Sequence, residues 1–163
     1  MDWDIAAKVV IPVVMFVLGF AVSRFTMTKK ERSDVLFQKQ NKYDEIIRGV
    51  SLAYSEYVSS IAEYVECSDG SRSLNCFLSV AQKGEAYFCQ MRSACAALIS
   101  GRLDDKVAKQ DLLPMVKRLV EETLPDHYKT LEEIAFKLAI PYAGKLNRND
   151  YASIYHVYDQ YCM

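Results

Sequence analysis

The hydrophobic pattern of the chain opens with a long apolar run near the N-terminus. No side chain is polar from Val9 to Val22, and the wider segment Ile5–Phe25 contains only three polar residues. A helix of about 20 apolar residues spans the hydrocarbon layer of a bilayer. The run therefore predicts a single transmembrane helix, with the anchor residues Ile5, Val9, Pro12, Phe16, Gly19, Phe20 and Ser23.

This run has two alternative interpretations, a buried core helix and a cleaved signal peptide. A core helix is disfavoured because Val9–Val22 has no polar stripe. The tripeptide Ala21-Val22-Ser23 carries small residues where a signal peptidase reads. The acidic start, with Asp2 and Asp4, and the bases that follow the run both argue against cleavage. Cleavage at this tripeptide stays an open alternative.

The charges on the two sides of the run predict its orientation. Two acids precede it, whereas four juxtamembrane bases follow it, namely Arg24, Lys29, Lys30 and Arg32. By the positive-inside rule, we expect the N-terminus outside and residues 26–163 in the cytoplasm of a bacterial inner membrane. Residues 24–48 hold seven bases against four acids. This excess also suits contact with anionic lipid headgroups, so membrane lipid is an expected partner.

Beyond the run, the apolar positions predict one long helix over residues 28–66. Its apolar seam advances in alternating steps of four and three and comprises Tyr43, Ile47, Val50, Tyr54, Tyr57, Ile61 and Tyr64. This heptad spacing fits either packing within a helical bundle or a dimeric coiled coil. Four tyrosines in the seam favour the bundle, so we expect Ile47 and Ile61 to be buried in it. The seam is also a candidate interaction surface.

A loop at residues 67–73 precedes a second predicted helix, which Ser73 caps and Gly101 ends. The expected inward residues of this helix are Leu74, Phe77, Leu78, Ala81, Phe88, Met91, Cys95, Leu98 and Ile99.

The C-terminal third predicts two or three more helices. The first lies within residues 104–124, where Asp111 caps a helix that has Pro114 in its first turn. We expect a break at Pro125, with Thr123 as the cap of the next helix. That helix ends at Pro141 and Gly144, and Asn147 caps the last one.

These elements predict an all-α protein. It has a tail and anchor over residues 1–27 and a bundle of about four or five helices over residues 28–163. Of the 163 residues, 51% are hydrophobic and 25% are charged, which fits a chain with a real core. The near-neutral balance, 20 bases against 21 acids, argues against a dedicated nucleic-acid binder.

Motifs for chemistry are missing from the sequence. It contains no zinc-type Cys pair, no di-iron ligand set and no Gly-rich phosphate loop, so we expect no metal, no cofactor, no small-molecule substrate and no enzymatic activity. His127 is expected in solvent, and His156 packed or at the surface. Of the five cysteines, Cys89 and Cys95 are expected in the core, and only Cys67 and Cys76 could form a bridge.

Tyrosine is abundant, with eleven residues, and most of them lie on the first and last helices after the anchor. Tyrosines suit half-buried positions and protein interfaces. The first interpretation is that these two helices pack together with their hydroxyls at the rim. The second is an exposed recognition surface for a protein.

The sequence thus predicts a membrane-anchored, non-enzymatic interaction module that holds a protein partner or a second copy of itself at the inner membrane. The alternative is a membrane-acting effector whose transmembrane helix oligomerises and perturbs the bilayer. Pro12, which kinks the span, and the spaced pair Gly19 and Ser23 allow this alternative.

Overall fold

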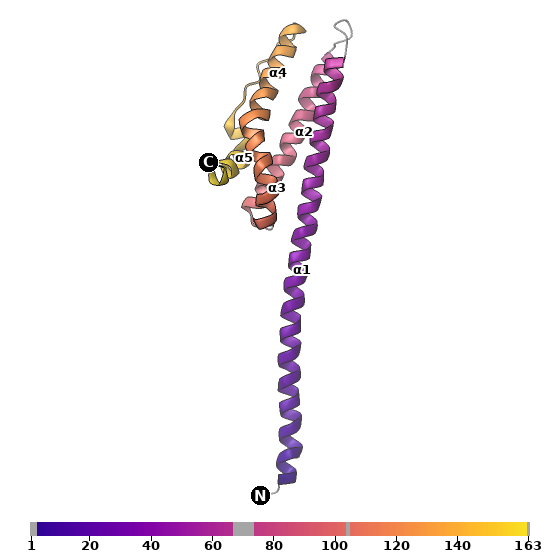
Figure 1. Cartoon of the computed structure of the whole chain (residues 1–163), viewed down its shortest axis with the longest axis vertical. Coiled ribbons are helices and arrows are strands. Elements are labelled where there is room, and N and C mark those ends of the chain that lie inside the picture. The colour runs from indigo at the N-terminus through magenta and orange to yellow at the C-terminus, as the bar shows by residue number, and fades with distance from the viewer. Residues whose placement is uncertain (1–2, 67–73, 104, 163) are drawn as a thin grey trace. The chain divides into compact units, whose positions relative to one another are not determined.

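The computed structural model describes the backbone of residues 3–66, 74–103 and 105–162, and their side chains except those of 3–19, 21–29, 32 and 105–109. Within these residues every regular element is a helix, which confirms the predicted all-α class. The elements are α1 (Trp3–Glu66), α2 (Leu74–Ile99), α3 (Asp105–Arg118), η1 (Leu119–Thr123), α4 (Leu124–Lys137), η2 (Arg148–Tyr151) and α5 (Ala152–Tyr161) (Figure 1).

The chain divides into two compact units, residues 1–39 and residues 40–163. The described residues of the first unit, 3–39, all belong to helix α1, and the predicted membrane anchor lies in this unit. Among the described residues, no helix is long and apolar enough to cross a bilayer. The predicted span, residues 5–25, lies outside the described side chains apart from Phe20, which is 60% exposed. The transmembrane helix and the boundary at residue 27 therefore stay predictions.

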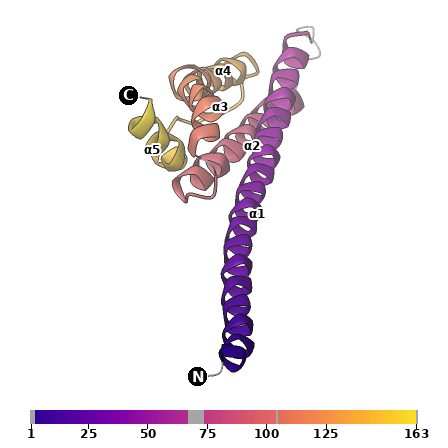
Figure 2. The same ribbon diagram turned by 60° about the horizontal axis from the view of Figure 1, so that its bottom comes forward.

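The second unit is a helical bundle built on the predicted seam of α1. Tyr43, Val50, Tyr57 and Tyr64 are buried, while the remaining seam residues are partly buried against the same core. Figures 1 and 2 show this part of α1 running beside α2. The seam thus packs within the bundle. Ile47 and Ile61 were expected to be buried, but they are only partly buried.

Helix α2 supplies the centre of the core, and its inward face differs partly from the prediction. The expected inward residues Phe77, Phe88, Met91, Cys95 and Leu98 are buried. Leu74, Leu78 and Ile99 are exposed, so those three expectations are wrong. Residues not expected there, Val80, Gly84 and Tyr87, are buried instead. The buried face follows positions 77, 80, 84, 87 and 91, which is a regular helical spacing. A glycine and a tyrosine at two of these positions make the spacing hard to recognise in the hydrophobic pattern.

The predicted break at Pro125 is absent, and helix continues through it. Thr123 and Leu124 both have helical backbone angles, and Thr123 makes no capping bond. Immediately before the proline, residues Leu119–Thr123 form a π-helical turn in which the amide of Leu124 donates to the carbonyl of Leu119. Proline has no amide to donate and crowds the preceding turn, and a wider turn accommodates both effects. Pro114 also lies inside helix α3, which begins at Asp105, so Asp111 is not a helix cap.

Helices α2 and α4 end in the same backbone motif with different residues. Gly101 and Ala139 both have positive φ, 66° and 51°. In each case the amide of the following residue donates to the carbonyl five residues earlier: Arg102 to Ala97, and Ile140 to Ala135. This is a Schellman cap, in which glycine is the favoured residue. Gly101 is therefore the predicted helix end, whereas α4 stops at Lys137, before the predicted Pro141 and Gly144.

The two caps make a matched prediction. Ala139→Gly is expected to raise the free energy of unfolding by about 0.5–1 kcal/mol because it relieves the left-handed strain of alanine. Gly101→Ala is expected to lower it by about 1 kcal/mol, since its Cβ would meet open space and only the backbone is strained. Urea unfolding of the full chain, followed by the near-ultraviolet dichroism of tyrosine, measures both. Equal signs for the two changes would contradict this account.

Helix α5 closes the bundle against α2 and α3. The side chain of Asn147 accepts a hydrogen bond from the amide of Asn149 at 3.1 Å, which confirms its predicted capping role. A short 3-10 turn, η2, then leads into α5, whose buried residues are Ile154 and Val157.

Candidate functional site

The predicted location of His127 in solvent is wrong. Its side chain is 1% exposed and lies within an aromatic cluster of residues from α1, α2 and α4. The ring centroids of Tyr57, Phe88 and Tyr128 lie 5.4, 4.9 and 5.6 Å from that of the imidazole, all in edge-on arrangements. Solvent exposure of His127 was expected because it follows Asp126 in the first turn of a helix. The local sequence does not show which face of that helix is buried.

His127 joins three helices through one ring. Its Nδ1 shares a hydrogen bond of 2.9 Å with the hydroxyl of Tyr57, while its buried Nε2 has no partner among the described atoms. Gly84 of α2 lies against the ring so closely that a Cβ there would be 2.2 Å from Cε1. Burial lowers the pKa of His127 to about 4, so the ring is neutral at pH 7. This neutral ring fixes the packing of the three helices. Its described hydrogen-bond partner is a phenol, not a carboxylate of the kind that orients a catalytic histidine.

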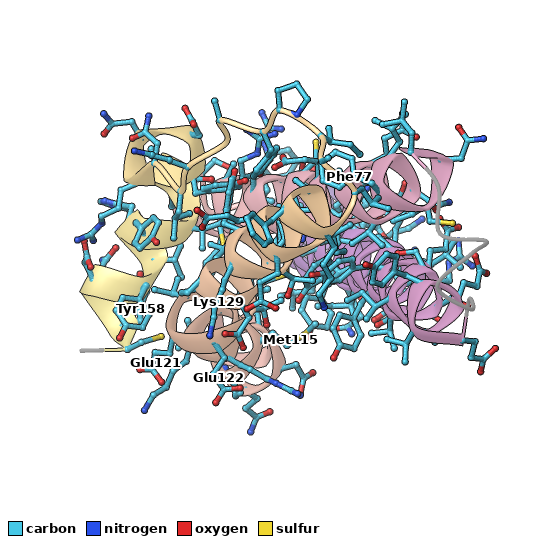
Figure 3. The ribbon with its side chains drawn as sticks, turned by 90° about the horizontal axis from the view of Figure 1, so that it is seen from above. Phe77, Met115, Glu121, Glu122, Lys129 and Tyr158 are labelled. Atoms are coloured by element: carbon cyan, nitrogen blue, oxygen red, sulfur yellow. The ribbon has the colours of Figure 1, made fainter. Side chains whose placement is uncertain are left out.

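Three tyrosines outside this cluster link helices by donating hydrogen bonds to carboxylates. The hydroxyl-to-oxygen distances are 2.7 Å for Tyr43 to Asp111, 2.9 Å for Tyr151 to Glu85 and 2.9 Å for Tyr158 to Glu121. Figure 3 shows Tyr158 and Glu121 close together where α5 meets η1. Burial, and then the bond to Asp111, raises the pKa of Tyr43. These phenols therefore stay protonated and donate, and tyrosines of α1 reach α2, α3 and α4 instead of pairing with the last helix.

An open groove of about 630 Å³ lies in the second unit between the first bundle turns of α1 and the last turns of α2. Its floor is made of small residues of α2, and its rim is polar. The lining residues are Lys42, Glu45, Ile46, Gln90, Ser93, Ala96, Ala97, Ser100 and Arg102. Lys42 pairs with Glu45 at 2.9 Å, whereas no ion pair of Arg102 is described. A shallow floor of this kind suits a macromolecular surface better than an enclosed small molecule.

Most of the predicted membrane residues carry no described side chain. The anchor residues Ile5, Val9, Pro12, Phe16, Gly19 and Ser23 and the bases Arg24, Lys29 and Arg32 fall in this category, although all belong to α1. Of the predicted juxtamembrane bases, only Lys30 is described, and it is exposed. The loop at residues 67–73, including Cys67 and the cap Ser73, lies outside the described residues.

The remaining chemistry-bearing residues are dispersed. Cys95 is fully buried, as predicted, and burial raises the pKa of its thiol to about 12. Cys89 is exposed, so its predicted place in the core is wrong. His156 is exposed, one of the two locations expected for it. Across residues 30–66, 74–103 and 110–162, no three histidine, cysteine or carboxylate side chains gather as metal ligands.

The burial of His127, its close contact with Gly84 and the π-helical turn were not predicted from the sequence. The signal for the turn is present in the chain, because the buried positions Leu112, Val116 and Leu119 are followed by Leu124 after a step of five. No known protein family, curated protein or solved structure matches this chain.

Proposed function

We propose that the chain is a membrane-anchored, non-enzymatic interaction module that holds a helical segment of another protein at the cytoplasmic face of a bacterial inner membrane. The observation that carries the proposal is the groove between α1 and α2, on a chain whose residues 5–25 are mostly apolar. The apolar segment supports attachment to a bilayer. The bases that follow it support a cytoplasmic location for the bundle.

The residues of the groove favour a helix as its occupant. Ser93, Ala96, Ala97 and Ser100 lie at helical spacing along α2, and side chains this small let a second helix approach closely. The floor is partly apolar, so a partner helix that carries small residues three and four positions apart on one face would bury that face there.

Charge selects among helical partners. Arg102 at the rim has no described ion-pair partner, while Lys42 is already neutralised by Glu45. The partner helix is therefore expected to carry an acidic side chain opposite Arg102. Since the charged rim is solvent-exposed, this pairing adds more to specificity than to affinity.

Site-specific photocrosslinking in growing bacteria tests the proposal on the full chain. With benzoylphenylalanine in place of Ser93, on the groove floor, we expect a covalent adduct of defined mass. The same probe at Ser55, an exposed serine of α1 outside the groove, should give none. Ala96→Trp, which fills the groove from an exposed position, should abolish the adduct, and Arg102→Glu should lower its yield by a smaller factor.

The outcomes separate the candidate functions. An adduct that Ala96→Trp leaves unchanged, or no adduct at all, would refute the interaction module. An adduct of twice the chain mass would identify a second copy as the occupant. A reporter active only in the cytoplasm, fused after Met163, checks the orientation in the same cells. Loss of membrane potential on overexpression, without any adduct, would support the membrane-acting effector instead.

A further inference from the structure

A second, smaller pocket opens beside the π-helical turn, away from the groove. It has a volume of about 90 Å³ and is lined by Tyr54, Tyr87, Met115, Arg118 and Thr123, which come from α1, α2, α3 and η1. Met115 and the adjoining Glu122 are labelled in Figure 3. One water occupies about 30 Å³ of the liquid, so the pocket has room for roughly three waters or one small ion.

Two phenol groups line this pocket without partners. No hydrogen bond of the hydroxyl of Tyr54 or Tyr87 is found within the described residues, whereas the hydroxyls of Tyr43, Tyr57 and Tyr151 each make one. Tyr87 is 4% exposed, and its ring is fixed by Tyr54 and Tyr57 with centroids at 5.2 and 6.2 Å. The ring of Tyr87 is thus held in place at the pocket, and its hydroxyl is left as a donor for a group that enters there.

The third donor is the guanidinium of Arg118. Its Nε lies 3.5 Å from Glu122, and the side chain is 68% exposed, so the guanidinium has further donors available. Burial raises the pKa of Tyr87 to about 12, an effect that the charge of Arg118 partly opposes. Tyr87 is thus protonated at pH 7 and donates. The hydroxyl of Thr123 is turned toward the carbonyl of Arg118 at 3.5 Å.

From this geometry we infer that the pocket at the π-helical turn binds a small oxyanion of the phosphate or carboxylate type. Arg118 supplies the charge and Tyr54 and Tyr87 supply two neutral donors. Guanidinium groups and phenols are the donors that match carboxylate and phosphate oxygens. The lining residues contain no carboxylate, which argues against a cation. The volume of about 90 Å³ matches a small anion.

The position of the pocket gives the ion a structural effect. Its lining joins α1 and α2 to the turn that carries α3 into α4, so a bound anion would connect all of these segments. This inference is independent of the partner groove, with which the pocket shares no residue.

Fluorine NMR of the full chain in a neutral detergent tests the inference. The protein is labelled with 3-fluorotyrosine, and Tyr54→Phe and Tyr87→Phe assign the two resonances. Titration with inorganic phosphate, and separately with acetate, is expected to shift both resonances saturably with a midpoint in the millimolar range or below. The arm with the lower midpoint identifies the anion class. Sodium chloride at matched ionic strength should give no saturable shift.

Two guanidinium variants supply the control. Arg118→Gln, at an exposed position, should raise the midpoint about tenfold or more because a charge-assisted bond is lost. Arg102→Gln, in the separate groove, should leave it unchanged. The inference is overturned if neither anion shifts the two resonances up to about 50 mM. It is also overturned if Arg118→Gln binds as the native chain does.

Discussion

Acidification from pH 6.5 to pH 4 should lower the free energy of unfolding of the bundle by about 3 kcal/mol through His127 alone. In the folded chain, burial lowers the pKa of this group to about 4, against 6.5 for an unburied imidazole. As the pH falls through this window, the unfolded chain binds a proton that the folded chain does not. Stability from this group is therefore nearly complete at pH 7, declines below 6.5 and is fully lost only below pH 4, once the folded chain is protonated as well.

Urea unfolding at half-unit pH intervals measures this loss. All eleven tyrosines lie within residues 40–163, so their near-ultraviolet dichroism reports on the bundle. His127→Gln is the control, because it keeps a hydrogen-bonding group and cannot titrate. Carboxylates titrate in both proteins, so the difference between the two profiles isolates His127. Parallel profiles would show that the imidazole is not buried as described.

Gly84→Ala should destabilise the bundle by about 1–3 kcal/mol or more. A Cβ at this position would be 2.2 Å from Cε1 and 2.8 Å from Nδ1 of His127, so the ring must move and its bond to Tyr57 must lengthen. Helix propensity works in the opposite direction, because alanine is the better helix former by about 1 kcal/mol. The measured loss is thus the steric penalty reduced by this gain.

Gly49→Ala is the matched control for this prediction. Gly49 is also inside a helix, but its added Cβ would meet only the flexible end of Gln90, at 3.4 Å. This change should stabilise the protein by up to about 1 kcal/mol. Combining Gly84→Ala with His127→Ala removes the clash, so the double variant should lose less than the sum of its parts. Strict additivity would mean that Gly84 and His127 do not meet.

The parts of the fold that follow simple periodicity could be predicted from the sequence. The seam of α1 from Tyr43 to Tyr64 has uninterrupted heptad spacing, and four of its seven positions are buried. The helix ends at Glu66 and Gly101 also agree, because Ser-rich and glycine signals act locally. These features depend on residues only a few positions apart.

The site could not be predicted because its parts meet only through tertiary packing. Tyr57 and His127 are 70 residues apart, and Gly84 joins them from a third helix. A histidine in the first turn of a helix, between Asp126 and Tyr128, is usually in solvent, and nothing local reveals that its ring fills the space left by a distant glycine. Likewise, Ala139 caps the end of α4 and adopts a backbone conformation that favours glycine. A prediction based on glycine and proline signals therefore placed the helix end later, at Pro141.

The π-helical turn has a consequence for the angular register of the long α3–α4 helix. Each added residue rotates everything that follows by about 100° around an α-helix. The five-residue turn inserts one such step, after which the inward positions resume at 124, 127, 131 and 134. Without the extra residue, an ideal helix continuing from Leu119 would direct position 123 into the core and turn the imidazole about a quarter of a revolution away from Tyr57. The one extra residue in the π-helical turn therefore determines that the C-terminal half of this helix presents His127 to α1.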